Sequence, residues 1–151
     1  MEVQQTGLAN IASRSHGHGG AGRTAGATEA KKEALVEKAR EVANGLLEAD
    51  QWATAERLLA AFFEHVPPVD VAERSPRDLC GAALSLWRFA ERRQPGHAKV
   101  RVYNPDVAAD GWSSPHTVVE IVNDDMPFLI DSGGIAINAS NRVVHLGIHP
   151  I

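Results

Sequence analysis

Apolar residues recur at helical spacing through the first two thirds of the chain and predict three amphipathic helices. The first covers residues 28–50, with Thr28 at its cap position. Its apolar face consists of Leu35, Ala39, Val42 and Leu46. The second covers residues 53–66 and ends before Pro67-Pro68. The third begins at Ser75-Pro76, where serine is a good cap and proline suits the first helical position, and it ends near residue 92.

The spacing changes at Lys99 from helical to alternating. Residues 99–103 alternate between valine and polar side chains, which predicts a half-buried strand. Residues 116–122 are rich in β-branched residues on both faces, as in an interior strand. Residues 127–139 supply an apolar helix, and residues 143–148 alternate again as a last strand.

A strand, a helix and a strand in this order predict a right-handed crossover with two parallel strands. Two strands and one helix are too few for a stable sheet. We therefore expect the chain to be a fragment, or its missing strands to come from elsewhere.

The first 28 residues differ from the rest. Residues 12–27 are mostly Gly, Ala, Ser, His and Arg, so ordering them would cost entropy with little burial in return. We expect residues 1–28 to be a disordered tail, followed by a helical segment over residues 29–95. His16 and His18 in this tail could touch a metal ion, but the polar-linker interpretation is preferred.

Composition narrows the function. The chain has 151 residues, a net charge of −4 and no basic stripe, which argues against nucleic acid as a partner. No apolar run approaches the roughly 20 residues that cross a membrane. Cys80 is the one cysteine, so a reducing compartment, the cytoplasm, is expected. Trp52 lies in a predicted turn between two helices and Trp87 in a predicted helix, and both are interpreted as packing residues.

The acidic turn after the strand at residues 116–122 is the most distinctive local feature. A strand that leads directly into a helix leaves free N–H groups near the positive end of the helix dipole. A small carboxylate-bearing ligand could bind these donors, with Asp124 and Asp125 meeting its ammonium group. The candidate ligand-binding residues are Asn123, Asp124, Asp125, Met126, Phe128 and Asp131. The alternative is that these acids only cap the helix and that Asp131 lies on its solvated face.

Other constellations favour structural roles. His145 and His149 share a strand face but stand about 13 Å apart by strand rise, too far for one metal ion, so packing is preferred for them and for His116. Cys80 has no local signature of a nucleophile. The chain lacks a glycine-rich dinucleotide fingerprint and a P-loop. We expect no metal, no cofactor and no catalytic residue in this chain.

Several long strings make a family resemblance specific. They run in order from Phe62-Phe63-Glu64-His65-Val66-Pro67-Pro68 through DVAERSPRDLCGAALSLWRFAERRQPG, KVRVYNP and GWSSPHTVVEIVNDDMPFLIDS to HLGIHPI. Over about residues 31–151 the sequence resembles the extreme N-terminal region of the large bacterial NAD-specific glutamate dehydrogenases.

The resemblance implies an α+β fold in which helices lead into the first half of an ACT-like module, a ferredoxin-like β-α-β unit over residues 96–151. Residues 116–122 would be its first strand, 127–139 its first helix and 143–149 its second strand. The NAD-binding catalytic domain would lie outside this chain, so NAD belongs to the full enzyme, which converts glutamate to 2-oxoglutarate and ammonium. ACT modules bind amino acids near the first strand–helix turn, here residues 123–128, or serve as oligomer contacts.

One stretch departs from the family pattern. Gly133-Gly134 stands where a robust helix is expected, and each glycine costs about 1 kcal/mol of helix stability relative to alanine. Three hypotheses follow. The chain is a non-catalytic part of a dehydrogenase, whose partners are the rest of that chain and a second copy; or it is a self-contained amino-acid sensor; or it is a structural module whose helices dock on a partner.

Overall fold

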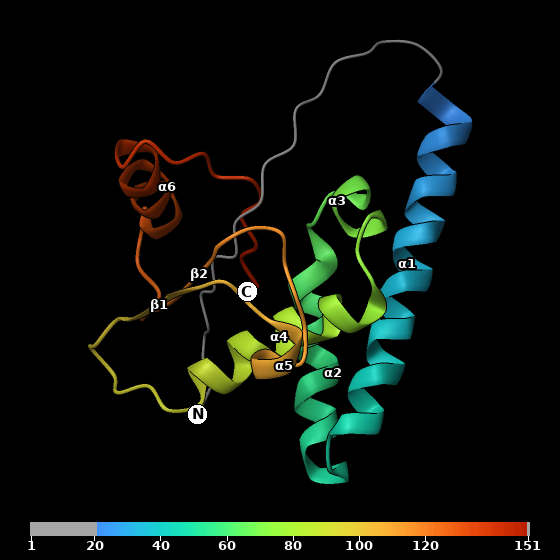
Figure 1. Ribbon diagram of the computed structural model, residues 1–151, viewed down its shortest axis with the longest axis horizontal. Coiled ribbons are helices and arrows are strands. Elements are labelled where there is room, and N and C mark those ends of the chain that lie inside the picture. The colour runs from blue at the N-terminus through green and yellow to red at the C-terminus, as the bar shows by residue number, and fades with distance from the viewer. Residues whose placement is uncertain (1–20, 151) are drawn as a thin grey trace.

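The computed structural model describes residues 21–150, which form six helices and two strands (Figure 1). The elements are α1 (Ala21–Leu46), α2 (Ala49–Glu64), α3 (Pro68–Ala72), α4 (Pro76–Ala90), β1 (Lys99–Tyr103), α5 (Val107–Asp110), β2 (Val118–Val122) and α6 (Leu129–Ala139). The chain is therefore α+β, with its helices first and a small sheet after them. None of the helices within residues 21–150 combines the length and the apolar character needed to cross a membrane.

The predicted helices pack into one helical layer. The long α1 lies against α2, α3 and α4, on the right of Figure 1. Ala39 and Ala43 of α1 are fully buried, whereas Leu46, predicted on the same face, is 65% exposed. Lys32 of α1 reaches the far end of α2, where its Nζ donates to the carbonyl oxygen of Glu64 at 3.1 Å. The shared core includes Leu59, Phe62, Phe63, Val71, Leu79, Leu84, Leu86 and Trp87.

Helix boundaries correct several predictions. α1 begins at Ala21, so residues 21–28 are helical and not part of a disordered tail, while residues 1–20, with His16 and His18, lie outside the described residues. The first predicted helix to residue 50 is broken after Leu46, and α2 starts at Ala49. The Gln51 side chain accepts the N–H of Glu48 at 3.4 Å, which explains this earlier start.

The start of α4 confirms its sequence signal. Ser75 is the N-cap, and its hydroxyl accepts the backbone N–H of Asp78 at 3.1 Å. Pro76 occupies the first turn. At the middle of α4, Gly81 lies against Trp112, so close that an added Cβ would stand 2.3 Å from the Cβ of that tryptophan. The glycine therefore lets the loop before β2 pack on α4.

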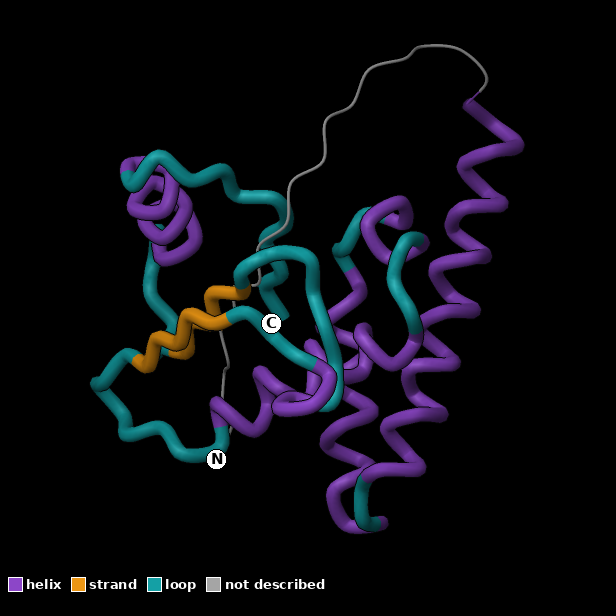
Figure 2. Tube along the Cα trace, in the orientation of Figure 1, coloured by secondary structure: helices purple, strands orange, loops and turns teal. Residues whose placement is uncertain are grey.

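The two strands form an antiparallel pair, which the sequence analysis did not anticipate (Figure 2). Arg101 stands opposite Glu120, and Val100 and Val102 stand opposite Ile121 and Val119. Side chains alternate across a strand, so one face carries Lys99, Arg101 and Tyr103 toward α4. The other face is aliphatic.

The predicted last strand is absent. Residues 142–150 form no strand, so the parallel crossover and the second strand of the β-α-β unit are wrong within the described part of the chain. Leu146 and Ile148 are nevertheless buried in the core cluster with Val122. The alternation at residues 143–148 therefore marks which side chains face the core, while a strand also needs a neighbour with which to share hydrogen bonds. The helix expected over residues 127–139 is present as α6, despite its two glycines.

Candidate functional site

The predicted ligand turn connects β2 to α6. Asn123, Asp125, Met126 and Phe128 lie in this connection, and the Nδ2 of Asn123 donates to the sulfur of Met126 at 3.1 Å. Asp125 is exposed, Met126 is 50% exposed and Phe128 is 76% exposed. Asp131 is exposed in the first turn of α6. The turn thus presents two carboxylates and two apolar side chains to solvent.

Asp124 differs from its neighbours because both of its carboxylate oxygens bind protein donors. Its Oδ1 pairs with Nη2 of Arg93, just after α4, and its Oδ2 accepts the backbone N–H of Gly96 at 2.7 Å. The hydrogen bond from Arg93, followed by that from Gly96, holds the pKa of Asp124 below its usual value. Asp124 therefore fastens the connection after α4 to the turn after β2.

The start of α6 has no side-chain cap. Phe128 occupies the N-cap position with a left-handed backbone, φ 64°. The alternative that these acids cap the helix is therefore not the arrangement in the structure. No side chain caps the N–H groups at the helix start, which lie at the positive end of the helix dipole. The ligand interpretation requires such uncapped donors.

Arg93 adds a second feature close to the turn. Its side chain is 13% exposed, and its Nη1 is buried without a hydrogen-bond partner among residues 21–150. A buried donor without a partner is costly, typically about 1–3 kcal/mol. Arg93 is a residue that the sequence analysis missed, because only the fold brings it to Asp124.

A buried polar network joins the sheet to α4. Glu120 is 2% exposed, and its carboxylate accepts hydrogen bonds from Arg101 and from the hydroxyl of Tyr103, the latter at 3.0 Å. Nη2 of Arg101 also donates to Oγ of Ser85 at 2.8 Å, and the Tyr103 hydroxyl lies 2.8 Å from that same oxygen. Burial is the main cause that raises the pKa of Tyr103, so its hydroxyl keeps its proton.

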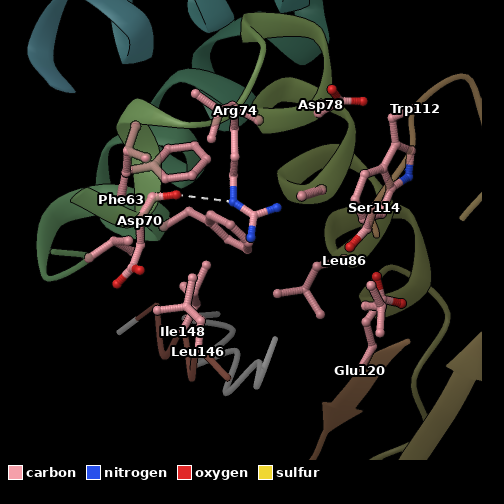
Figure 3. A pocket seen from close by; sticks show the side chains of 16 residues that line it. Phe63, Asp70, Arg74, Asp78, Leu86, Trp112, Ser114, Glu120, Leu146 and Ile148 are labelled. Carbon is pink, nitrogen blue, oxygen red and sulfur yellow. Dashed lines mark hydrogen bonds between the residues drawn. The ribbon is translucent and has the colours of Figure 1, made fainter. Parts of the chain in front are cut away.

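A small cavity lies between the helical layer and β2 (Figure 3). Its volume is about 30 Å³, room for one or two water molecules. The Arg74 side chain reaches among the lining residues, and its Nε donates to the carbonyl oxygen of Asp70 at 3.1 Å. Burial lowers the pKa of Arg74, and the carboxylates of Asp70, Asp78 and Glu73 oppose that shift. The cavity is too small for an amino acid.

Two of the histidines stack on each other, a contact that the sequence did not predict. The rings of His116 and His145 stack with centroids 4.6 Å apart, joining the loop before β2 to the C-terminal segment. In the part of the chain that the structure describes, no three potential metal-ligating side chains gather. Trp87 is 8% exposed within the core, in line with a packing role.

Comparison with known proteins places the sequence in context. Residues 58–151 match the family described as glutamate dehydrogenase, ACT1 domain. The chain is 38% identical over 111 residues to an NAD-specific glutamate dehydrogenase of Halomonas elongata, a match that covers 74% of the chain. It is 40% identical over 84 residues, 56% of the chain, to an NAD-specific glutamate dehydrogenase of Pseudomonas aeruginosa. The matches span 7% and 5% of those relatives. No solved structure matches the chain.

Proposed function

Because this chain belongs to the glutamate dehydrogenase ACT1 domain family, we propose that it acts as a non-catalytic, regulatory or assembly part of an NAD-dependent glutamate dehydrogenase. The complete enzyme would oxidise glutamate to 2-oxoglutarate and ammonium, with NAD as the oxidant. The rest of that enzyme would be the principal partner of this chain. The single cysteine supports our proposal of a cytoplasmic location.

The turn that follows β2 does not fit NAD. A dinucleotide site needs a glycine-rich turn between a strand and a helix, so that backbone N–H groups can approach the pyrophosphate. Here β2 is followed by Asn123, Asp124 and Asp125, whose carboxylates would repel a pyrophosphate. We therefore propose that NAD binds to another part of the enzyme.

The exposed face of the sheet is the observation that supports an assembly role. Val100 and Val102 are 60% and 62% exposed, and they stand opposite Ile121 and Val119. Ile135 of α6 is 68% exposed, and no residue of α6 is buried. Large exposed groups of aliphatic side chains usually mark an interface. Two strands also need further strands for independent stability. We propose that the remainder of the dehydrogenase chain covers this face.

An activity assay tests the non-catalytic claim. The purified chain is mixed with glutamate and NAD, and NADH formation is followed by absorbance. The expected rate equals that of a heat-inactivated sample, since no glycine-rich turn follows either strand within residues 21–150. A glutamate-dependent rate above that control would contradict the proposal.

The turn supports a second candidate function, the binding of an amino-acid effector. The unpaired Nη1 of Arg93 and the uncapped start of α6 could meet a carboxylate, and exposed Asp125 could meet an ammonium group. Asp124 is less suited, since its oxygens already bind Arg93 and Gly96. Calorimetric titration with each common amino acid tests this function. Asp125→Ala should weaken binding, and Glu33→Ala, on exposed α1 surface, should not; flat titrations would contradict it.

Self-association is a further proposal that rests on the same sheet. The outer edges of β1 and β2 have no neighbouring strand within residues 21–150, so they could pair with a second copy. Light scattering over a range of concentrations should then show a rising average mass. A constant monomer mass would exclude self-association in the isolated chain.

A further inference from the structure

A second concave region lies far from the turn in sequence and uses other elements. A groove of about 530 Å³ runs between the end of α1, α4 and α5. Val42, Leu46 and Leu84 give it an apolar floor, and Arg77, Arg88 and Arg101 line it as well. We call this region the arginine groove. Its size falls within the 300–1,000 Å³ typical of small-molecule sites, which combine apolar walls with a few polar groups.

The three arginines differ in how far the protein already uses their donors. The Nε of Arg77 donates to the carbonyl oxygen of Gly111 at 2.8 Å, which positions the side chain beside α5. Arg101 uses Nε and Nη2 on Glu120 and Ser85. The guanidinium of Arg88 makes no hydrogen bond or ion pair with any residue in the range 21–150. Terminal guanidinium nitrogens therefore remain available in the groove.

The charge of the groove contrasts with that of the chain. Three arginines and one aspartate line it, although the chain has a net charge of −4. That aspartate, Asp110, already accepts the backbone N–H of Asp106 at 2.9 Å. Arg77, Gly81, Leu84 and Arg88 follow one another at helical spacing, so α4 presents two cations and an apolar strip on a single face.

From this combination we infer that the arginine groove binds a small organic anion, with a phosphate or carboxylate on the guanidinium groups and an apolar body on Val42, Leu46 and Leu84. Guanidinium groups present paired donors that match the oxygens of both kinds of anion. The apolar floor favours an organic body over an inorganic ion. This site is separate from the Asn123–Asp131 turn and does not depend on the proposed effector there.

Four probes test the inference. Phenyl phosphate and benzoate carry both an anionic group and an apolar ring, benzyl alcohol carries the ring without a charge, and inorganic phosphate is the anion alone. Each is titrated into the ¹⁵N-labelled full chain at low salt, and backbone amide shifts are followed by NMR. Saturable shifts at residues 77–88 and 109–111 are expected with phenyl phosphate, benzoate or both. Benzyl alcohol should give none, and inorganic phosphate should bind more weakly. The preferred head group identifies the anion class.

Two variants with the same charge change separate a built site from general attraction. Arg88→Gln should weaken binding by about five-fold, the effect of one exposed ion pair of about 1 kcal/mol. Arg57→Gln is the control, since Arg57 is exposed on α2 and donates to its own helix at the carbonyl oxygen of Ala53. Thermal melts check that both variants fold. Equal weakening by both variants, or no saturable shift in the groove with either anion, would overturn the inference.

Discussion

Arg101 and Glu120 stand directly opposite each other on β1 and β2, and the Nε of Arg101 donates to the Glu120 carboxylate at 2.7 Å. Glu120 is almost fully buried, while the Arg101 side chain is 35% exposed. Arg101 also lies over the rings of Phe89 and Tyr103, with distances of 4.7 and 4.4 Å to their centroids. The pair thus joins the sheet to α4 through charge, hydrogen bonds and ring contacts together.

Glu120→Ala should destabilise the chain more than an average substitution. Removing one partner of a buried ion pair leaves an uncompensated charge, at a cost of about 3–5 kcal/mol. The partial exposure of Arg101 places the expected loss near the lower end of this range. Urea unfolding followed by circular dichroism measures it. Glu33→Ala, on the exposed side of α1, is the matched control; equal losses in the two variants would contradict the role of the pair.

Gly81→Ala should destabilise the chain although alanine is the better helix former. The added Cβ would meet the side chain of Trp112 at 2.3 Å, and overpacking of this kind costs about 1–3 kcal/mol. Gly45→Ala in α1 is the control, since its Cβ would have nothing within 4 Å and should stabilise by up to about 1 kcal/mol. The two variants should therefore shift the urea midpoint in opposite directions. A shift in the same direction would contradict the close packing at Gly81.

The thiol of Cys80 should react slowly with an aromatic disulfide reagent at pH 8. Cys80 is 1% exposed, and burial raises its pKa to about 11, so little thiolate is present. In urea the thiol should react at least about ten-fold faster, because its pKa returns toward its ordinary value of roughly 8.5. The absorbance of the aromatic thiolate that the reagent releases measures both rates. Comparable rates in the two states would contradict the buried position.

Acidification should loosen the contact between the C-terminal segment and the loop before β2. Burial, the neighbouring His145 and the charge of Arg74 lower the pKa of His116. A lowered histidine pKa stabilises the folded state above the unfolded pKa of about 6.5, and this contribution is lost as pH falls through the folded value. The amides of residues 145–148 should therefore lose protection against hydrogen exchange below pH 6, relative to the amides of α2.

His116→Gln provides the comparison for this pH effect. The variant has no imidazole to protonate at position 116. The protection of residues 145–148 against exchange, relative to α2, should therefore depend less on pH between 7.5 and 5. The same pH dependence in the parent chain and the variant would show that the stacked pair is not responsible.

Local signals in the sequence predicted the helices better than the sheet. Ser75 and Pro76 carry the start of α4 in adjacent residues, and the structure confirms it. The pairing of β1 with β2 depends on contacts across a loop of more than a dozen residues, and no periodicity encodes it. Residues 143–148 alternate because Leu146 and Ile148 face the core, but no neighbouring strand is present to complete a ladder.

In the candidate site too, the local feature was predictable from the sequence and the long-range contacts were not. The position of the turn after β2 followed from the change in residue pattern at Asn123. The use of Asp124 did not, since Arg93 and Gly96 lie about thirty residues earlier in the chain. Arg92-Arg93 at the end of the third predicted helix gave a local hint of a partner for an acid, but such a pair also suits a solvated helix terminus. Burial of Glu120 was equally hidden, because a single acid among valines gives no indication of its partner.

A chimera tests the central claim, that this chain is an assembly or regulatory part of a glutamate dehydrogenase, most directly. This chain replaces the matching segment of the Halomonas elongata enzyme, and a second variant lacks that segment. Glutamate-dependent NADH formation and sedimentation velocity are measured for both and for the parent. We predict that the chimera resembles the parent, while the deleted enzyme loses activity, assembly or both. A chimera that behaves like the deleted enzyme, or a deletion without effect on either measurement, would contradict the account.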